Sequence, residues 1–228
     1  EGAKLKPKNS MAVGLQLVKE GRGEAFVSAG NTGGVMFNAL RVLGRIKGVS
    51  RPAMAPLFPV RDGYAVVIDI GANADVRPEF LLEFAIMGSL YAEKVRHIAN
   101  PRVGILSNGE EAGKGNQLVK DTFHLLENSG LNFVGNIEPK MLFAHQADVV
   151  VTDGFTGNIL LKTSEAVARL LTDVIKEQIK SSLISSIGGL LVKPALKNVK
   201  SMMDPGEVGA VPLLGIDGLV FIGHGSSD

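Results

Sequence analysis

Five short apolar runs in this chain each end in a loop of small or polar residues. They begin at Phe26, Val66, Val103, Val149 and Leu219. Within each run the apolar positions are nearly continuous, as in strands that are buried on both faces of a sheet. Helix-like segments follow the first four runs, so the alternation predicts a mostly parallel α/β sheet with helices on both faces.

Helix signals between these runs are also clear. Apolar residues recur there at intervals of three or four, and Pro78 stands where a first helical turn tolerates proline. No repeat or linker divides the chain, so we expect residues 1–228 to form a single α/β domain. Helices are expected from a cap at Asn9 or Ser10 to Gly21, over Val35–Ile46, from Pro78, after Asn116 and, the longest, after Gly157. A sixth short strand is expected over Phe133–Ile137.

Residues 178–203 differ from the rest of the chain. No acidic residue lies between Glu177 and Asp204, and apolar residues recur there at near-helical spacing. Gly188-Gly189 and Pro194 are expected to interrupt this stretch and to give an amphipathic helical hairpin. Two interpretations stay open: a tip on an anionic membrane surface, or a buried or subunit-interface helix pair. The tip residues would be Leu183, Ile187, Leu190, Leu191, Lys193 and Lys197.

Composition narrows the possible functions. The chain has no cysteine, which excludes disulfides, thiolate metal sites and a cysteine nucleophile and is compatible with a reducing cytosol. With 24 basic and 23 acidic residues and only 5% aromatics, we expect no nucleic-acid partner. No apolar run approaches the roughly 18 residues of a membrane span, and no secretory signal is recognisable. The chain lacks an initiator Met, so we expect it to be a piece of a longer protein.

The loops after the runs are suited to an anion. Parallel sheets place ligands at the carboxyl ends of their strands, where glycine backbone and Asn, Ser and Thr side chains would meet. Such groups stabilise a phosphate or a developing oxyanion. The known nucleotide motifs are not met: Gly30–Gly34 lacks the dinucleotide-binding spacing, and Gly109–Gly115 is one residue short of a P-loop.

Titratable residues in these loops have more than one interpretation. His224 is the one histidine expected at a strand end, where it would either contact a ligand or hold the structure. Asp69, Asp153, Glu110 and Glu111 would act as metal ligands or general bases, or cap helices and hold loops. The residues alone leave these alternatives open.

Seven short blocks of the sequence occur together in a characteristic order. They are Val27–Gly33, Asp69–Asn73, Glu83–Gly88, Gly109–Glu111 with Lys114–Asn116, Phe133–Glu138, Asp153–Asn158 with Leu161–Thr163, and Gly223–Ser227. In these blocks and in their order the chain resembles the PlsX family of bacterial phosphate acyltransferases of phospholipid synthesis. The family's opening strand and its last helical region have no counterpart in this chain.

The resemblance implies an activity and a setting. A long-chain fatty acyl group would pass from acyl carrier protein to inorganic phosphate, giving an acyl phosphate, without a cofactor or metal. The fold would be a three-layer α/β/α Rossmann-like sheet related to isopropylmalate dehydrogenases and phosphotransacetylases. The enzyme would be a cytoplasmic homodimer, associated peripherally with an anionic membrane surface, and a membrane glycerol-3-phosphate acyltransferase would use its product.

Roles for individual residues follow as a hypothesis. Phosphate is nucleophilic enough towards a thioester, so the protein needs to orient it and to stabilise the oxyanion. Lys114 or Lys162 would supply charge, and Asn158 or His224 would donate to the thioester oxygen. The substrate-binding set would be Ser28, Gly30, Asn31, Thr32, Gly33, Asp69, Asn73, Asn108, Glu110, Asp153, Gly154 and Ser226.

Two other functions compete with this hypothesis. The same scaffold would suit a phosphotransacetylase-like enzyme that uses acyl-coenzyme A, or a decarboxylating dehydrogenase that needs nicotinamide. A non-catalytic lipid- or carrier-binding scaffold would explain the amphipathic tip but would leave the polar strand ends without a purpose. A basic patch facing the acidic carrier protein would favour the acyl carrier protein as donor.

Overall fold

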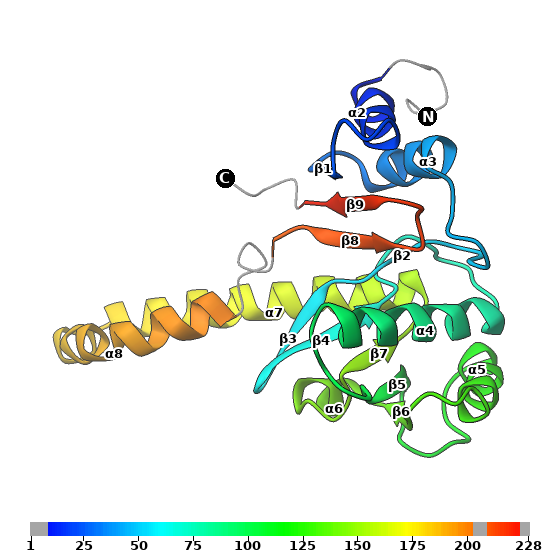
Figure 1. Cartoon of the computed structure of the whole chain (residues 1–228). Helices are drawn as coiled ribbons and strands as arrows, with labels where there is room; N and C mark the ends of the chain where they lie inside the picture. The colour runs from blue at the N-terminus through cyan, green and yellow to red at the C-terminus, as the bar shows by residue number, and fades with distance from the viewer. Residues whose placement is uncertain (1–8, 203–208, 224–228) are drawn as a thin grey trace.

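The computed structural model describes residues 9–202 and 209–223, in which the strands form two sheets, one above the other (Figure 1). The larger sheet has the order β3-β4-β7-β5-β6. Its pairs are parallel except β3 with β4. Its strands are β3 (Leu57–Val60), β4 (Gly63–Ile68), β5 (Val103–Leu106), β6 (Phe133–Ile137) and β7 (Val149–Val151).

Helices cover both faces of the five-stranded sheet because neighbouring residues of its strands point to opposite sides. Ala65 and Val67 of β4 belong to one core cluster, and Val66 and Ile68 belong to the other. The second cluster is closed by α4 (Pro78–Lys94) and α5 (Gln117–Glu127), whereas α6 (Pro139–Phe143) and α7 (Gly154–Lys180) lie on the first. This arrangement is the predicted α/β/α sandwich.

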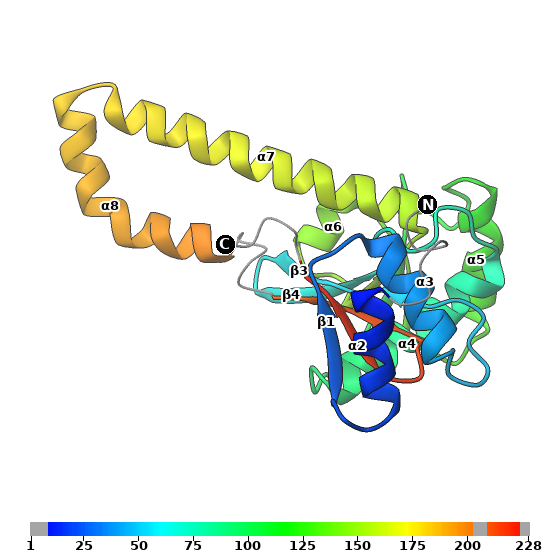
Figure 2. The same cartoon turned by 90° about the horizontal axis from the view of Figure 1, so that it is seen from above.

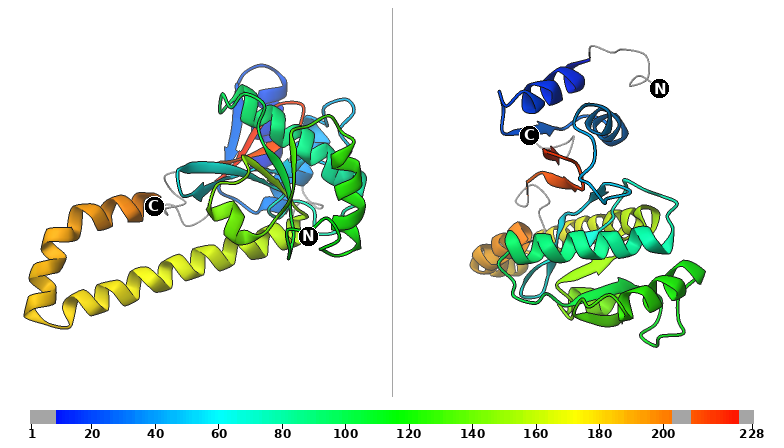
Figure 3. Two further views of the ribbon diagram at one scale, coloured as in Figure 1. Left: turned by 90° about the horizontal axis from the view of Figure 1, so that it is seen from below. Right: turned by 45° about the vertical axis from the view of Figure 1, so that its right-hand side comes forward.

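The smaller sheet has the order β1-β9-β8-β2. It contains β1 (Ala25–Ser28), β2 (Ala53–Met54), β8 (Val211–Leu214) and β9 (Leu219–Ile222), and the helices beside it are α2 (Ser10–Lys19) and α3 (Thr32–Val42). Only β1 and β9 run parallel. Leu15, Val35 and Val220 belong to the same core cluster as Phe58 and Val67 of the larger sheet, so apolar packing joins the two sheets. Figure 3 shows the smaller sheet and its helices beside the larger one from two further directions.

The α/β class is confirmed, and all five predicted apolar runs are strands: β1, β4, β5, β7 and β9. The sixth predicted strand is β6. The prediction that these five runs share one sheet is wrong. β1 and β9 pair with each other in the smaller sheet, whereas β4, β5 and β7 belong to the larger sheet. Three strands, β2, β3 and β8, were not predicted. β2 has only 2 residues, and prolines interrupt the other two strands, at Pro59 of β3 and Pro212 of β8, so the strand pattern is weak in all three.

Most helix boundaries agree with the prediction. Asn9 caps α2, with its side-chain oxygen accepting a hydrogen bond from the Ala12 N–H. The second helix ends at Val42, earlier than the expected Ile46, and Gly44 follows with a φ of 85°. Such a left-handed residue after the last turn is a common helix stop. The longest helix, α7, starts at Gly154, so residues 154–157 form its first turn.

A helical hairpin projects from the body, as predicted, but its turn lies elsewhere (Figure 2). It consists of α7 and α8 (Leu183–Met202), joined at Ser181-Ser182. The expected interruption at Gly188-Gly189 and Pro194 does not occur, because α8 runs through all three residues. Instead α8 changes direction along its length (Figure 2), as expected where proline lacks the N–H of a helical hydrogen bond.

Candidate functional site

The loops that follow five strands of both sheets open into one cavity of about 1350 Å³. Three of these strands, β4, β5 and β7, belong to the larger sheet, and β1 and β9 belong to the smaller one. The predicted loops therefore lie at one place and not on opposite sides of the molecule. The lining residues from these loops include Ala29–Thr32, Ile70, Gly71, Ser107, Asn108, Thr152, Asp153 and Gly223.

Three helices begin at this cavity, and the capping residue of each lines it. The Asn31 side chain accepts a hydrogen bond from the Gly34 N–H at the start of α3. Asn116 caps α5 and Asp153 caps α7 in the same way. A helix N-terminus carries partial positive charge and several backbone N–H groups without a partner in the helix. Three such ends make this rim suitable for an anion.

Asp69 shapes the loop after β4 and does not line the cavity, contrary to the substrate-binding role predicted for it. Its side chain is fully buried. One carboxylate oxygen accepts hydrogen bonds from the N–H groups of Met54, Gly71 and Ala72, and the other accepts two from Asn73. Burial raises the pKa of Asp69, and these hydrogen bonds partly offset that effect. Asn73, also predicted to bind substrate, is committed to the same loop.

The first turn of α7 packs directly on this loop. The Gly154 N–H donates to the Asn73 carbonyl at 2.8 Å. A Cβ atom at Gly157 would lie 2.0 Å from the Asp69 carbonyl oxygen, so only glycine fits there. This close approach places the next residue, Asn158, at the cavity and beside Gly71.

The loop after β5 is held from outside the cavity. The Asn136 side chain donates to the Glu111 carbonyl at 2.7 Å, and the Lys140 ammonium lies 2.9 Å from carboxylates of both Glu110 and Glu138. The hydrogen bonds to Glu110 and Glu138 raise the pKa of Lys140. Glu110, predicted to bind substrate, thus pairs with Lys140 and does not line the cavity.

Seven of the predicted site residues line the cavity. Lys162, one of them, also pairs with Glu165 at 3.0 Å. Among those that do not line it, Ser28 accepts a hydrogen bond from the Gly30 N–H, and the stem of Lys114 packs on Gly109. His224 and Ser226 lie outside the described residues. The seven are Gly30, Asn31, Thr32, Asn108, Asp153, Asn158 and Lys162; Ser28, Gly33, Asp69, Asn73, Glu110, Lys114 and Gly154 are placed around them.

Other lining residues were not predicted. Ser107, Asn116, Thr152 and Thr156 contribute polar groups, and the Ser107 hydroxyl is buried without a partner among the described residues. Asn116 had a readable signal, since it precedes a helical pattern as a cap does. The apolar wall, which includes Phe58 of the unpredicted β3, had none.

The described residues contain no group of three or more acidic or histidine side chains able to hold a metal ion. Within the same part of the chain, no helix has both the length and the apolar character needed to span a bilayer.

Sequence comparison identifies close relatives of this chain. The profile of a family described as "Fatty acid synthesis protein" matches residues 2–228. Phosphate acyltransferase of Elusimicrobium minutum is 50% identical over 218 residues, which are 96% of this chain and 64% of that protein. Phosphate acyltransferase of Dictyoglomus turgidum is 50% identical over 226 residues, covering 98% of this chain and 67% of that protein. The chain thus spans about two thirds of the length of these relatives.

Solved structures share the fold at low sequence identity. A phosphotransacetylase from Streptococcus pyogenes has a TM-score of 0.56 and 22% identity, covering 69% of this chain and 55% of that one. The EutD phosphotransacetylase from Staphylococcus aureus has a TM-score of 0.53 and 21% identity, with the same coverage. These similarities support the α/β fold.

Proposed function

This chain belongs to the fatty acid synthesis protein family, with the phosphate acyltransferases as its relatives, and we propose that its protein transfers a long-chain acyl group from acyl carrier protein to inorganic phosphate. An oxygen of hydrogen phosphate attacks the carbonyl carbon of the thioester. The tetrahedral intermediate then collapses, the carbon–sulfur bond breaks, and the proton of the phosphate passes to the departing thiol. The products are an acyl phosphate and the free carrier.

The single observation that carries this proposal is that one cavity joins a polar rim to a long apolar wall. The rim has three helix N-termini and the side chains of Asn31, Thr32 and Asn108. The wall includes Phe58, Phe143 and one face of α7. An acyl phosphate has the same two parts, an anionic head and an apolar chain.

Phosphate is placed at the start of α3 in this proposal. In the loop Gly30–Gly34 the Gly30 and Gly34 N–H groups donate to Ser28 and Asn31, whereas the N–H groups of Thr32 and Gly33, in the first turn of α3, have no partner within the helix and are available to an anion. Lys162 on the first turns of α7 supplies a cation at the same cavity. Lys114, the alternative cation, is exposed but does not line the cavity, so we favour Lys162.

Asn158 is proposed to donate to the thioester oxygen. It lies in the first turns of α7, where the contact between Gly157 and the loop after β4 holds the backbone in place. A donor fixed in this way needs no reorganisation when negative charge develops on the oxygen. His224, the other predicted donor, lies outside the described residues.

A phosphotransacetylase-like reaction with a short acyl group is the second candidate. A two-carbon group would leave the apolar wall along α7 uncovered, because the wall extends well beyond the polar rim. We therefore favour the long-chain substrate. The donor itself is tested by comparing acyl carrier protein with coenzyme A as the thiol.

The hairpin is proposed to place this reaction at a membrane. Leu183 and Ile184 at its turn are each 84% exposed, and Lys193 and Lys197 are exposed farther along α8. Apolar groups with flanking lysines bind the interface of an anionic bilayer. We propose a peripherally attached, dimeric cytoplasmic enzyme that passes its product to a membrane glycerol-3-phosphate acyltransferase.

The reaction is tested by incubating the protein with palmitoyl acyl carrier protein and phosphate and trapping acyl phosphate with hydroxylamine. Hydroxamate that forms only when phosphate is present supports the proposal. Release of free fatty acid without trapped product would contradict it, and an equal rate with palmitoyl-coenzyme A would remove the carrier protein as the specific donor.

Asn158 is tested in the same assay. We expect Asn158→Ala to lower kcat by about 10²-fold to 10³-fold, as loss of an oxyanion donor does in other enzymes. Asn128→Ala is a matched control, because Asn128 is exposed at the far end of α5. A correctly folded Asn158→Ala variant with the parent rate would rule out this role.

A further inference from the structure

One face of α7 forms a long apolar side of the cavity. Residues spaced three or four apart along a helix lie on the same face, as Leu160, Ser164, Val167 and Leu171 do. The Ser164 hydroxyl on this face donates to the Leu160 carbonyl at 2.8 Å and is thereby satisfied within the helix. The face consists of Leu160, Leu161, Ser164, Val167, Ala168 and Leu171; Ile159, Lys162, Thr163 and Glu165 of the same helix also line the cavity.

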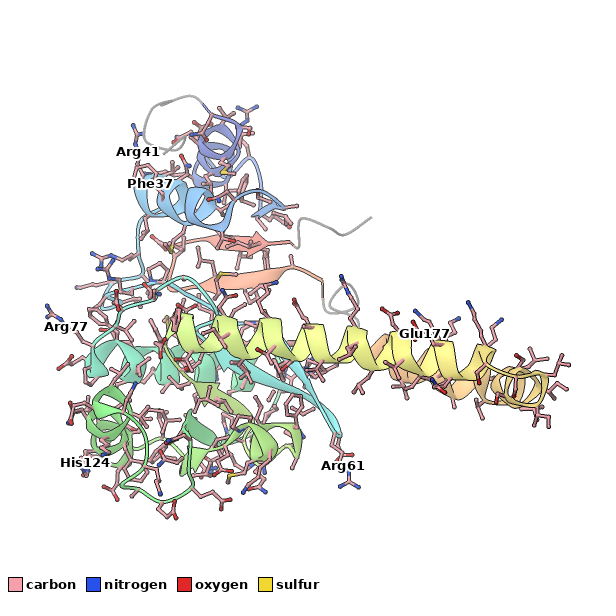
Figure 4. The ribbon with its side chains drawn as sticks, turned by 180° about the vertical axis from the view of Figure 1, so that it is seen from behind. Phe37, Arg41, Arg61, Arg77, His124 and Glu177 are labelled. Atoms are coloured by element: carbon pink, nitrogen blue, oxygen red, sulfur yellow. The ribbon has the colours of Figure 1, made fainter. Side chains whose placement is uncertain are left out.

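The second wall of the cavity includes β3, which, like α7, extends away from the polar rim. The helix starts at the carboxyl end of β7, where the polar rim lies, and β3 runs antiparallel to β4. Residues of β3 from Leu57 to Pro59 therefore lie progressively farther from the rim. Arg61, in the turn after β3, lies on the side of the body towards which α7 projects, whereas Arg77 and His124 lie on the opposite side (Figure 4).

Aromatic rings make this second wall apolar as well. Phe58 of β3 is almost fully buried, and its ring centroid lies 5.5 Å from that of Phe143 on α6 in a tilted arrangement. Both rings line the cavity. Beyond Glu165, the α7 residues that line the cavity are Val167, Ala168 and Leu171, so the cavity is apolar on both walls at the end farthest from the rim.

Apolar side chains on the α7 face remain uncovered by the protein. Val167 is 49% exposed and Leu171 is 54% exposed, although both line the cavity. Partly exposed apolar groups inside a concave site with polar groups at one end are typical of a site for an amphipathic ligand. Leu171 is the last residue of α7 that lines the cavity, and Val174 and Ile175 lie beyond it.

We infer that the acyl chain of the substrate lies along this face of α7, with its carbonyl at Asn158 and its methyl end at Leu171, and that Leu171 sets the preferred chain length. The inference rests on the proposed function, which supplies the acyl substrate. A rise of about 1.5 Å per residue puts Leu171 about 20 Å along the helix from Asn158, enough for a long chain. Methylenes beyond Leu171 leave the cavity and add little affinity.

The test measures binding and not turnover. Alkylphosphonates carry an anionic head and a chain that cannot be transferred, so a series of increasing chain length is titrated into the protein by calorimetry, below the concentrations at which they self-associate. Each methylene buried in the cavity is expected to strengthen binding about fourfold. The gain is expected to stop at the chain length that reaches Leu171.

Two neighbouring leucines provide a matched pair of variants. Leu171→Trp shortens the cavity, so we expect the plateau to come at a shorter chain and the longest phosphonates to lose at least tenfold in affinity, while short ones bind as before. Leu170 is similarly exposed, at 61%, but does not line the cavity, so Leu170→Trp is expected to match the parent. Helical circular dichroism of both variants verifies that they fold.

The outcomes separate this inference from the proposed reaction. If the plateau stays at the parent chain length in Leu171→Trp, or if Leu170→Trp moves it equally, the chain does not end at Leu171 and the inference is wrong, even when acyl phosphate is still formed. If the plateau moves in Leu171→Trp alone while the parent forms no acyl phosphate, the chain site is supported and the proposed reaction is removed.

Discussion

The two halves of α7 are built for different surroundings. In the body its first turn is packed so closely on the loop after β4 that a Cβ atom at Gly157 would lie 2.0 Å from a carbonyl oxygen. In the hairpin Leu170 and Leu171 are more than half exposed, and a Cβ atom at Gly188 of α8 would have no neighbour within 4 Å. The body therefore fixes the geometry of the site, whereas the hairpin keeps apolar surface available.

The largest expected effect follows from close packing in the body. We expect Gly157→Ala to lower the free energy of unfolding by about 3 kcal/mol or more, because the new methyl group overlaps backbone that cannot move aside. Urea denaturation measures the change. A loss below about 0.5 kcal/mol would show that α7 and the loop after β4 separate easily, and the contrast between the two regions would fail.

A second prediction concerns the ion pair between Arg102 and Asp148. These residues precede β5 and β7, at the ends of the strands away from the cavity. The Asp148 carboxylate is almost buried and accepts hydrogen bonds from the backbone N–H of Arg102, at 2.8 Å, and from its guanidinium, at 2.9 and 3.0 Å. We expect Arg102→Ala to cost about 2 kcal/mol of unfolding free energy at pH 7, because it removes the guanidinium from this carboxylate. The carboxylate then keeps only the backbone N–H of residue 102 and His145, whose Nε2 lies 3.4 Å from Oδ1. The exposed outer part of Arg102 keeps the cost below that of a fully buried pair.

This effect should depend on pH. Burial alone would raise the pKa of Asp148, but the hydrogen bonds and charge of Arg102 outweigh it and lower the pKa. A lowered folded-state pKa gives stability that is present above the ordinary value of 3.8 and is lost as the pH falls through the folded-state value. The difference in unfolding free energy between the parent and Arg102→Ala should therefore become smaller as the pH falls. A difference that stays constant down to pH 3 would contradict this assignment.

The third prediction concerns the hairpin. Replacing Lys193 and Lys197 with alanine should weaken binding to anionic vesicles about 30-fold, since each lysine near such a surface contributes about 1 kcal/mol. Lys47→Ala with Lys120→Ala, which removes two exposed lysines of the body, is the control. Equal losses in the two double variants, measured by vesicle sedimentation, would mean that the hairpin is not the attachment site.

The smallest expected effect is a gain in stability. Gly188 lies inside α8 with open space around it, so Gly188→Ala should raise the unfolding free energy by about 0.5–1 kcal/mol through helix propensity. The same urea titration as for Gly157→Ala tests it. Destabilisation would indicate that Gly188 contacts a partner, such as a second copy of the chain.

The sequence predicts local elements well and distant pairings poorly. Buried strands such as Val149–Val151 and helix caps such as Asn9 depend on neighbouring residues in the sequence, and the structure contains both. The edge strand β3 was missed because Pro59 interrupts its pattern, and proline is tolerated there only because the strand lies at the edge of the sheet.

The same limit applies to the site. The loops after β4, β5 and β7 could be predicted to meet, since parallel strands of one sheet end together. The loops after β1 and β9 meet them for another reason, because apolar packing joins the second sheet to the first. The commitment of Asp69 to backbone N–H groups could not be predicted, because Met54, one of its partners, lies on another strand. The turn of the hairpin was also misplaced: Gly189 lies within α8 because Ile179 of α7 packs against it, so closely that a Cβ atom there would lie 2.3 Å from the Ile179 side chain.

The two helices of the hairpin are connected in the chain to strands of different sheets. One helix, α7, rises from the end of β7, and the chain after α8 continues into β8 of the other sheet. Residues of α7 and Val211 of β8 both line the cavity, so the chain leaves for the hairpin from one side of the cavity and returns to another.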